Sequence, residues 1–158
     1  MGVMKNTAAE VVLWKYRENR RNYPGYHLTA DLAGCEILRT TFQSLAHATT
    51  RLETSIALSP ITPAVLSVPN NRAGNATVVC FEKWSLASGP EFEDPYFIFG
   101  ESGTQCRLVL SRALCARVCE GIEDIGRGRG DYSVGAGGQQ VLWFWWHPSR
   151  PLSVHRGG

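Results

Sequence analysis

The sequence has no long hydrophobic run, and this argues against several classes of protein. No apolar stretch approaches the roughly 18 residues that a membrane-spanning helix requires, and no run of signal-peptide length follows the first six residues. We therefore expect a cytoplasmic protein that does not bind a membrane. The content of 44% hydrophobic and 19% charged residues is typical of a globular domain and argues against a disordered chain.

The chain also has little excess of charge of either sign. Its 16 basic and 14 acidic residues give a net charge of +2, which is too balanced to indicate a nucleic-acid-binding surface by itself. One segment, residues 15–23, mixes basic and aromatic side chains, but Glu18 interrupts it. The sequence therefore argues against nucleic acid as a partner.

Recognisable signatures of metal binding and nucleophilic catalysis are missing. Zinc sites usually contain paired cysteine or histidine knuckles, whereas Cys115 and Cys119 lie four positions apart and the histidines have no ligand spacing. No Gly-x-Ser-x-Gly motif occurs. The remaining catalytic candidate is Cys106, which we expect near a helix start, where the helix dipole would lower the pKa of its thiol. We expect no metal and no cofactor, and we favour a thiol enzyme least.

Aromatic residues, by contrast, are concentrated near the C-terminus. Residues 140–146 include three of the five tryptophans, and both faces of the strand that they would form are apolar or aromatic. Such a strand must be buried on both sides. We expect helices to cover one face. The second face is covered either by loops of the chain, such as residues 87–95, or by a partner, and the sequence leaves these two alternatives open.

Hydrophobic periodicity predicts two long helices and five or six strands. Apolar residues at spacings of three and four predict helices over residues 30–50 and 106–123. Alternating apolar residues and turn-forming flanks predict the strands, which are residues 10–17, 64–68, 76–86, 96–99, 131–134 and 139–146. Residues 70–75 are expected to form a hairpin loop.

This order of elements predicts one α+β domain over residues 1–158, with a flexible tail from about residue 150. The expected architecture is a mostly antiparallel sheet of five or six strands with the two helices packed on one face. The hairpin connections between neighbouring strands are the reason for expecting antiparallel pairing.

Two loops carry the charged candidates for a binding site. The glycine-rich loop contains Arg127, Arg129 and Asp131, which suit an anionic ligand. Phosphate loops run from a strand into a helix, however, and here the order is reversed, so a plain connector is the alternative. The acidic loop contains Glu91, Glu93 and Asp94, which suit a basic partner, and a solvated loop is the alternative.

The functional hypothesis that we favour is a small protein-binding domain, such as an inhibitor or neutralising partner of another protein. Tryptophan and tyrosine are the residues most enriched at binding hot spots. In this hypothesis Trp84, Trp143 and Trp145 form the contact or the core beneath it, and the acidic loop forms its rim; self-association is included. The alternative is a domain that binds a small anionic molecule in a pocket between sheet and helices, with the glycine-rich loop at its mouth.

Overall fold

The computed structural model describes residues 9–17, 24–69, 77–130 and 132–149, and these form nine strands and three helices. The helices are α1 (Leu32–Ala46), α2 (Pro63–Leu66) and α3 (Arg112–Gly126). The strands are β1 (Val11–Tyr16), β2 (Tyr26–Ala30), β3 (Leu52–Ala57), β4 (Val78–Cys80), β5 (Lys83–Ser88), β6 (Phe97–Ser102), β7 (Gln105–Leu110), β8 (Tyr132–Gly137) and β9 (Gln140–Phe144).

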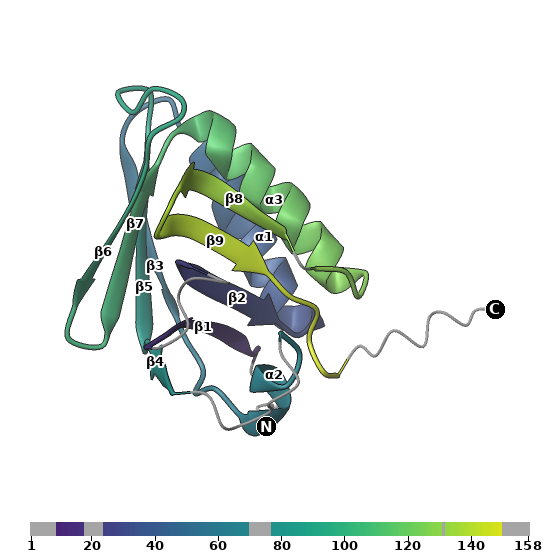
Figure 1. The fold of residues 1–158 in the computed structure, drawn as a ribbon. Coiled ribbons are helices and arrows are strands. Elements are labelled where there is room, and N and C mark those ends of the chain that lie inside the picture. The colour runs from purple at the N-terminus through teal and green to yellow at the C-terminus, as the bar shows by residue number, and fades with distance from the viewer. Residues whose placement is uncertain (1–8, 18–23, 70–76, 131, 150–158) are drawn as a thin grey trace, which may run out of the picture.

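The described strands form two sheets rather than one (Figure 1). The five-stranded sheet has the order β4-β1-β2-β9-β8, and the four-stranded sheet has the order β3-β5-β7-β6. Most neighbouring strands pair antiparallel, and β2–β9 and β5–β7 pair parallel. The predicted α+β class, the mostly antiparallel pairing and the two main helices are confirmed, whereas the expectation of a single sheet is wrong.

The two sheets and the two long helices share one core. Helices α1 and α3 pack against each other and contact β2, β8 and β9, and the four-stranded sheet stands beside them, edge-on at the left of Figure 1. Buried side chains from all four parts meet in one cluster, including Leu28, Leu38, Leu108, Ile122 and Phe144. This burial of apolar surface is the main stabilising contribution to the fold.

The topology contains an internal repeat that the sequence does not reveal. In each half of the chain, two antiparallel strands are followed by a long helix and by two more antiparallel strands, which gives β1-β2-α1-β3-β5 and β6-β7-α3-β8-β9. The first half has in addition α2 and β4, which are inserted between β3 and β5. Each half contributes one pair to each sheet. Within the sheets, the two halves meet at the parallel pairs β2–β9 and β5–β7.

Helix α1 forms where the apolar spacing predicts it. Its buried residues include Cys35, Leu38, Phe42 and Leu45, which recur every three or four positions. Asp31 caps its first turn, because the carboxylate oxygen Oδ1 accepts a hydrogen bond from the backbone N–H of Gly34 at 2.7 Å.

The predicted start of the second long helix is wrong. Cys106 and Leu110 lie in β7, and the helix begins after Ser111, whose Oγ accepts a hydrogen bond from the backbone N–H of Leu114 at 3.3 Å. The sequence misleads here because its apolar residues satisfy two periodicities at once. Cys106, Leu110 and Leu114 are four apart, as in a helix, while residues 106, 108 and 110 alternate, as in a strand. Pairing with β5 and β6 decides for the strand.

Two further local predictions are wrong. Residues 76–86 do not form one strand, because the chain passes from β4 in one sheet to β5 in the other around the buried Phe81. Residues 64–68 do not form a strand either. Pro63 starts the short helix α2, and Thr62 caps it by accepting the Val65 N–H. The C-terminal hairpin is confirmed as β8–β9, and the predicted loop at 70–75 and tail from residue 150 lie outside the described residues.

Candidate functional site

Two of the three tryptophans that we considered as contact residues, Trp84 and Trp145, belong to the interior of the chain. Trp84 is 0% exposed and Trp145 is 2% exposed. Trp143 is half-buried, and its indole Nε1 donates a hydrogen bond to the carbonyl oxygen of Pro24 at 2.8 Å. Trp84 and Trp145 cannot reach a partner while the domain stays folded.

The second face of the β9 strand is covered by the chain itself. A second apolar cluster lies there, made of Val12, Trp14, Tyr16, Val65, Leu66 and Trp145, with Trp143 and Trp146 packed against it. The cover thus includes α2, which lies beside β1 (Figure 1), rather than the loop at 87–95. His27 lies at the centre of these rings, and its Nδ1 accepts a hydrogen bond from Trp145 Nε1 at 3.0 Å.

The glycine-rich loop is a connector from α3 to β8 that Asp124 organises. The guanidinium groups of Arg127 and Arg129 lie 4.0 Å and 3.6 Å from Asp124 Oδ1, and Tyr132 donates its hydroxyl proton to Oδ2 at 2.7 Å. Both arginine side chains are exposed, but their nearest anion is this carboxylate of the chain itself. Asp131 lies outside the described residues.

A shallow cavity of about 350 Å³ lies between the two long helices. It is therefore not the pocket between sheet and helices that the sequence suggested. Arg127 is one of its lining residues, and the others are Leu32, Cys35, Glu36, Arg39, Ile122, Glu123 and Gly126. Two carboxylates and two guanidinium groups give this surface no net charge.

Burial keeps the thiols of Cys106, Cys115 and Cys119 in their neutral form. Cys106 lies inside β7 and is fully buried; this burial, followed by the charge of Glu101, raises the pKa of its thiol. The expected lowering of that pKa is therefore wrong, because no helix begins at this residue. Burial also raises the pKa of Cys115 to about 12 and that of Cys119 to about 11. These cysteines are packed like small apolar residues.

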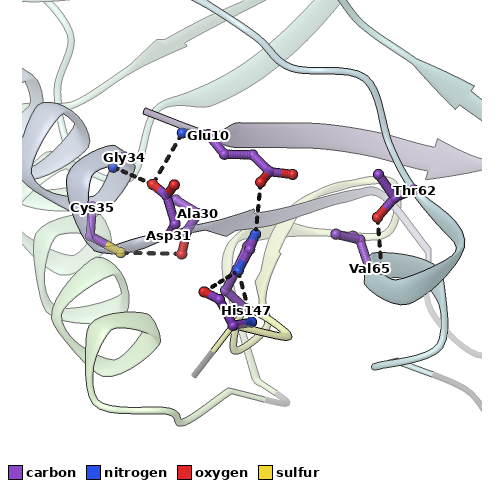
Figure 2. Close-up of polar contacts among 9 residues, drawn as sticks. Glu10, Ala30, Asp31, Gly34, Cys35, Thr62, Val65 and His147 are labelled. Atoms are coloured by element: carbon purple, nitrogen blue, oxygen red, sulfur yellow. Dashed lines mark hydrogen bonds and ion pairs between the residues drawn. The ribbon is translucent and has the colours of Figure 1, made fainter. Parts of the chain in front are cut away.

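Ser149, His147 and Glu10 lie close together just after β9, and Figure 2 shows His147 beside Glu10. Nε2 of the buried His147 lies 3.3 Å from Glu10 Oε1, and Ser149 Oγ lies 2.7 Å from Nδ1. The backbone N–H of Ser149 donates to the same Nδ1 at 3.1 Å. The lone pair that a general base needs is therefore already shared with a backbone donor. This arrangement closes a local turn and ties the end of β9 to the start of β1.

The part of the chain that the structure describes contains no group of three histidine, cysteine, aspartate or glutamate side chains that could hold a metal ion. None of the helices in this part is long and apolar enough to cross a membrane.

The acidic loop forms an exposed surface that also contains aromatic residues. Glu91, Glu93 and Asp94 are all exposed. The rings of Phe92 and Tyr96 lie beside them with centroids 5.2 Å apart, and Tyr96 is 42% exposed. The same face continues along β6 to Ile98, which is 47% exposed. We call the six residues 91–94, 96 and 98 the acidic–aromatic patch.

Sequence reasoning found the carboxylates of this patch but missed its aromatic and aliphatic members. The signal was present in the alternation of residues 96–99. Phe97 and Phe99 are buried, so the side chains of Tyr96 and Ile98 must point to the opposite face. When a strand is apolar on both faces and only one face packs on the core, the other face needs a cover. In the part of the chain that the structure describes, no residue covers the face that carries Tyr96 and Ile98.

Hydrogen bonds hold the acidic loop in one conformation. The Phe92 N–H donates to the Gly89 carbonyl at 3.2 Å, and the Tyr96 N–H donates to the Glu93 carbonyl at 2.8 Å. Ser111 fixes the end of the loop, because its N–H donates to the Tyr96 carbonyl at 2.8 Å and its Oγ donates to Asp94 Oδ1 at 3.2 Å.

Arg51 supplies the one guanidinium group that contacts the acidic loop among the described residues. It lies 5.2 Å from the Phe92 ring centroid, and its Nη1 lies 3.9 Å from Glu91 Oε2, while its Nε donates to Glu53 at 2.8 Å. Glu93 and Asp94 are left without a cationic partner among the residues that the structure describes. The patch therefore keeps a net negative charge.

Comparison of the chain with protein-family models, with curated proteins and with solved structures gives no match.

Proposed function

We propose that the chain is a protein-binding domain that contacts a basic region of another protein through the acidic–aromatic patch. The observation that carries this proposal is the combination of unneutralised carboxylates with Tyr96 and Ile98 on one surface. Aromatic side chains supply contact area at the centre of an interface, and a rim of charge steers the partner and selects it.

The rigidity of the loop supports this proposal. Ordering a flexible loop on binding costs free energy, and a loop that already holds its bound conformation avoids this cost. The hydrogen bonds of Phe92, Tyr96 and Ser111 supply that order in the free protein. A compact, preorganised acidic surface suits an inhibitor or neutralising partner, because it can cover a basic functional surface and exclude the natural ligand of that surface.

The proposal is tested by affinity capture from a lysate of the native source, with matched variants of the tagged chain. Glu93→Gln and Ile98→Ala change the patch. Glu120→Gln and Ile37→Ala are their controls, because Glu120 is exposed on α3 and Ile37 on α1 is 44% exposed. We expect a partner with a basic surface that the wild type and both controls retain and that both patch variants lose.

The salt dependence of capture gives a second readout. If charge steers the association, raising the ionic strength from about 50 to about 500 mM weakens it. A partner retained equally by Glu93→Gln and Ile98→Ala, or bound equally at both salt concentrations, would place the contact elsewhere and contradict the proposal.

A second candidate function rests on the cavity between α1 and α3. Arg39 and Arg127 face Glu36 and Glu123 around an apolar floor, which suits a small molecule with charges of both signs better than a simple anion. Calorimetric titration with amino acids tests this candidate, and Arg127→Ala should weaken any binding by about tenfold. Binding that Arg127→Ala leaves unchanged would contradict it.

A further inference from the structure

The two edges of the four-stranded sheet differ in how they are protected. At the β6 edge, Gln140 Oε1 accepts the backbone N–H of Phe99 at 2.6 Å, and Glu101 is bound by both Lys15 and Tyr26 of the five-stranded sheet. At the β3 edge, no backbone hydrogen bond joins residues 52–57 to any described residue outside β5, and the first bond to a strand of the other sheet is that of the Ser59 N–H to the Val11 carbonyl at 2.7 Å. An unprotected edge strand is a template for pairing with another strand.

The hydrogen-bonding groups that β3 presents can be assigned from its pairing with β5. The Leu58 N–H donates to the Glu82 carbonyl at 2.9 Å, so residues 52, 54, 56 and 58 point their backbone groups toward β5. In an antiparallel ladder the alternate residues point theirs away. Glu53, Ser55 and Ala57 therefore direct their N–H and C=O groups outward, and all three residues are exposed.

We propose that β3 pairs antiparallel with β3 of a second copy of this chain, about a twofold axis at Ser55, so that two four-stranded sheets become one continuous sheet. This register overlaps residues 52–58 along their full length. It places Ser55 opposite the partner's Ser55 and Glu53 opposite the partner's Ala57, and it forms about six backbone hydrogen bonds.

Charge complementarity supports this register. Within one chain, Ala57 lies directly opposite Lys83 of β5 on the outer face of the sheet. Glu53 of one copy therefore faces the partner's Lys83 across the small side chain of the partner's Ala57. Both side chains are exposed in the single chain. Glu53 already accepts a hydrogen bond from Arg51 Nε of its own chain at 2.8 Å, and the twofold axis adds the partner's Lys83 as a second cation at each of the two Glu53 residues.

The inner face supports the same register. Leu52 and Leu58 are only partly buried against the core at the edge of the sheet. The twofold pairing places Leu52 opposite the partner's Leu58, so that each leucine covers the exposed side of the other. Cross-strand apolar pairs of this kind stabilise sheets. The surface used is β3 together with Lys83; it contains no residue of the acidic–aromatic patch, and it adjoins that patch through Arg51, which contacts both Glu53 and Glu91.

The test is sedimentation equilibrium of the full chain from about 1 to about 200 μM. We expect the wild type to pass from the 17.4 kDa monomer to a dimer of twice this mass. Glu53→Lys and Lys83→Glu should each raise the dissociation constant by about tenfold, because each turns both ion pairs into repulsive pairs. An equimolar mixture of the two variants should restore association, because every position 53 then faces a position 83 of opposite charge.

A cross-linking variant measures the register independently of affinity. In Ser55→Cys the two thiols would lie opposite each other on the axis, so mild oxidation should form a covalent dimer. Ser44→Cys, at an exposed position on α1, is the matched control and should not. A wild type that stays monomeric up to about 200 μM overturns the proposal. It is likewise overturned by charge variants that associate like the wild type, or by equal cross-linking at both cysteine positions.

Discussion

Gly121 of α3 is the position where the packing of the aromatic strand can be tested most directly. A Cβ atom added at this glycine would lie 2.6 to 2.7 Å from three ring carbons of Phe144, the last residue of β9. The helix therefore touches the ring with its backbone, and the absence of a side chain at Gly121 permits this contact. Replacement of Gly121 by alanine has two opposing effects on the free energy of unfolding.

The first effect is favourable, because alanine stabilises a helix interior by about 1 kcal/mol relative to glycine. The second effect is unfavourable, because the ring is fully buried and cannot move without disturbing its neighbours. Overpacking of this kind costs about 1–3 kcal/mol. We expect the second effect to dominate, so that Gly121→Ala lowers the free energy of unfolding by about 1 kcal/mol.

The assay is urea unfolding followed by tryptophan fluorescence, with Gly126→Ala as the matched control in the same helix. At Gly126 the nearest atom to an added Cβ, among those outside its own helix neighbourhood, is Leu32 Cδ2 at 4.0 Å, an ordinary contact. This control should be neutral or stabilising by up to about 1 kcal/mol. Phe144→Leu should reduce the cost of Gly121→Ala, because it removes the ring that the new methyl group meets.

A Gly121→Ala protein as stable as the Gly126→Ala protein would refute the reasoning. It would mean that β9 does not approach α3 as closely as these distances require.

Three other predictions concern charge and thiols. Asp31→Ala removes the cap of α1 and should lower the urea midpoint by the equivalent of about 1–2 kcal/mol, whereas Asp31→Asn keeps an acceptor and should cost less. Burial opposes ionisation of Glu101, but the hydrogen bonds from Lys15 and Tyr26 outweigh burial and lower its pKa. Its contribution to stability is therefore complete above its unfolded pKa of about 4.5 and is lost as the pH falls through the lower folded value. Wild type and Glu101→Gln should therefore differ at pH 7 and converge as the pH is lowered through the folded pKa of Glu101; a difference that stays constant down to acid unfolding would contradict this. A limiting alkylating reagent at pH 7 should modify the half-buried Cys80 before the buried Cys106, and equal rates at both cysteines would show that the core is open.

The sequence predicted those elements whose periodicity has one interpretation. Helix α1 was found because its buried residues follow only a helical spacing. The hairpin β8–β9 was found because the glycine-rich residues 135–138 indicate a turn, although residues 135–137 belong to β8 and the turn itself is at 138–139. The start of α3 was missed because Cys106, Leu110 and Leu114 satisfy a helical spacing while the alternation of residues 106–110 satisfies that of a strand. Neighbouring strands resolve this ambiguity, and their positions are not encoded locally.

The division of the strands into two sheets could not be read from the sequence for a related reason. Residues 78–86 have a continuous alternating pattern, yet Phe81 turns the chain between β4 and β5 and is itself buried. A change of sheet depends on which surfaces lie on either side of the turn. Here the Leu13 carbonyl accepts the Phe81 N–H at 3.3 Å, and this contact spans 68 positions of the chain.

Which surface is free to bind a partner depends on which aromatic residues the fold buries and which it leaves exposed. The tryptophan-rich strand indicated binding because one of its faces lacked an evident cover, but Trp14, Tyr16 and α2 cover that face within the chain. A hot spot must be exposed before it is bound, so the fully buried tryptophans cannot form one. Four large apolar residues are exposed in the part of the chain that the structure describes. Two of them are Tyr96, which follows the unneutralised Glu93 and Asp94 in the chain, and Ile98, whose side chain alternates onto the same side as Tyr96. Leu32 and Ile37, the other two, lie on α1 beside charges of both signs, including the ion-paired Glu36 and Arg39. The imbalance of charge is what distinguishes the acidic–aromatic patch, and it explains why neutralising Glu93 should affect binding while neutralising Glu120 should not.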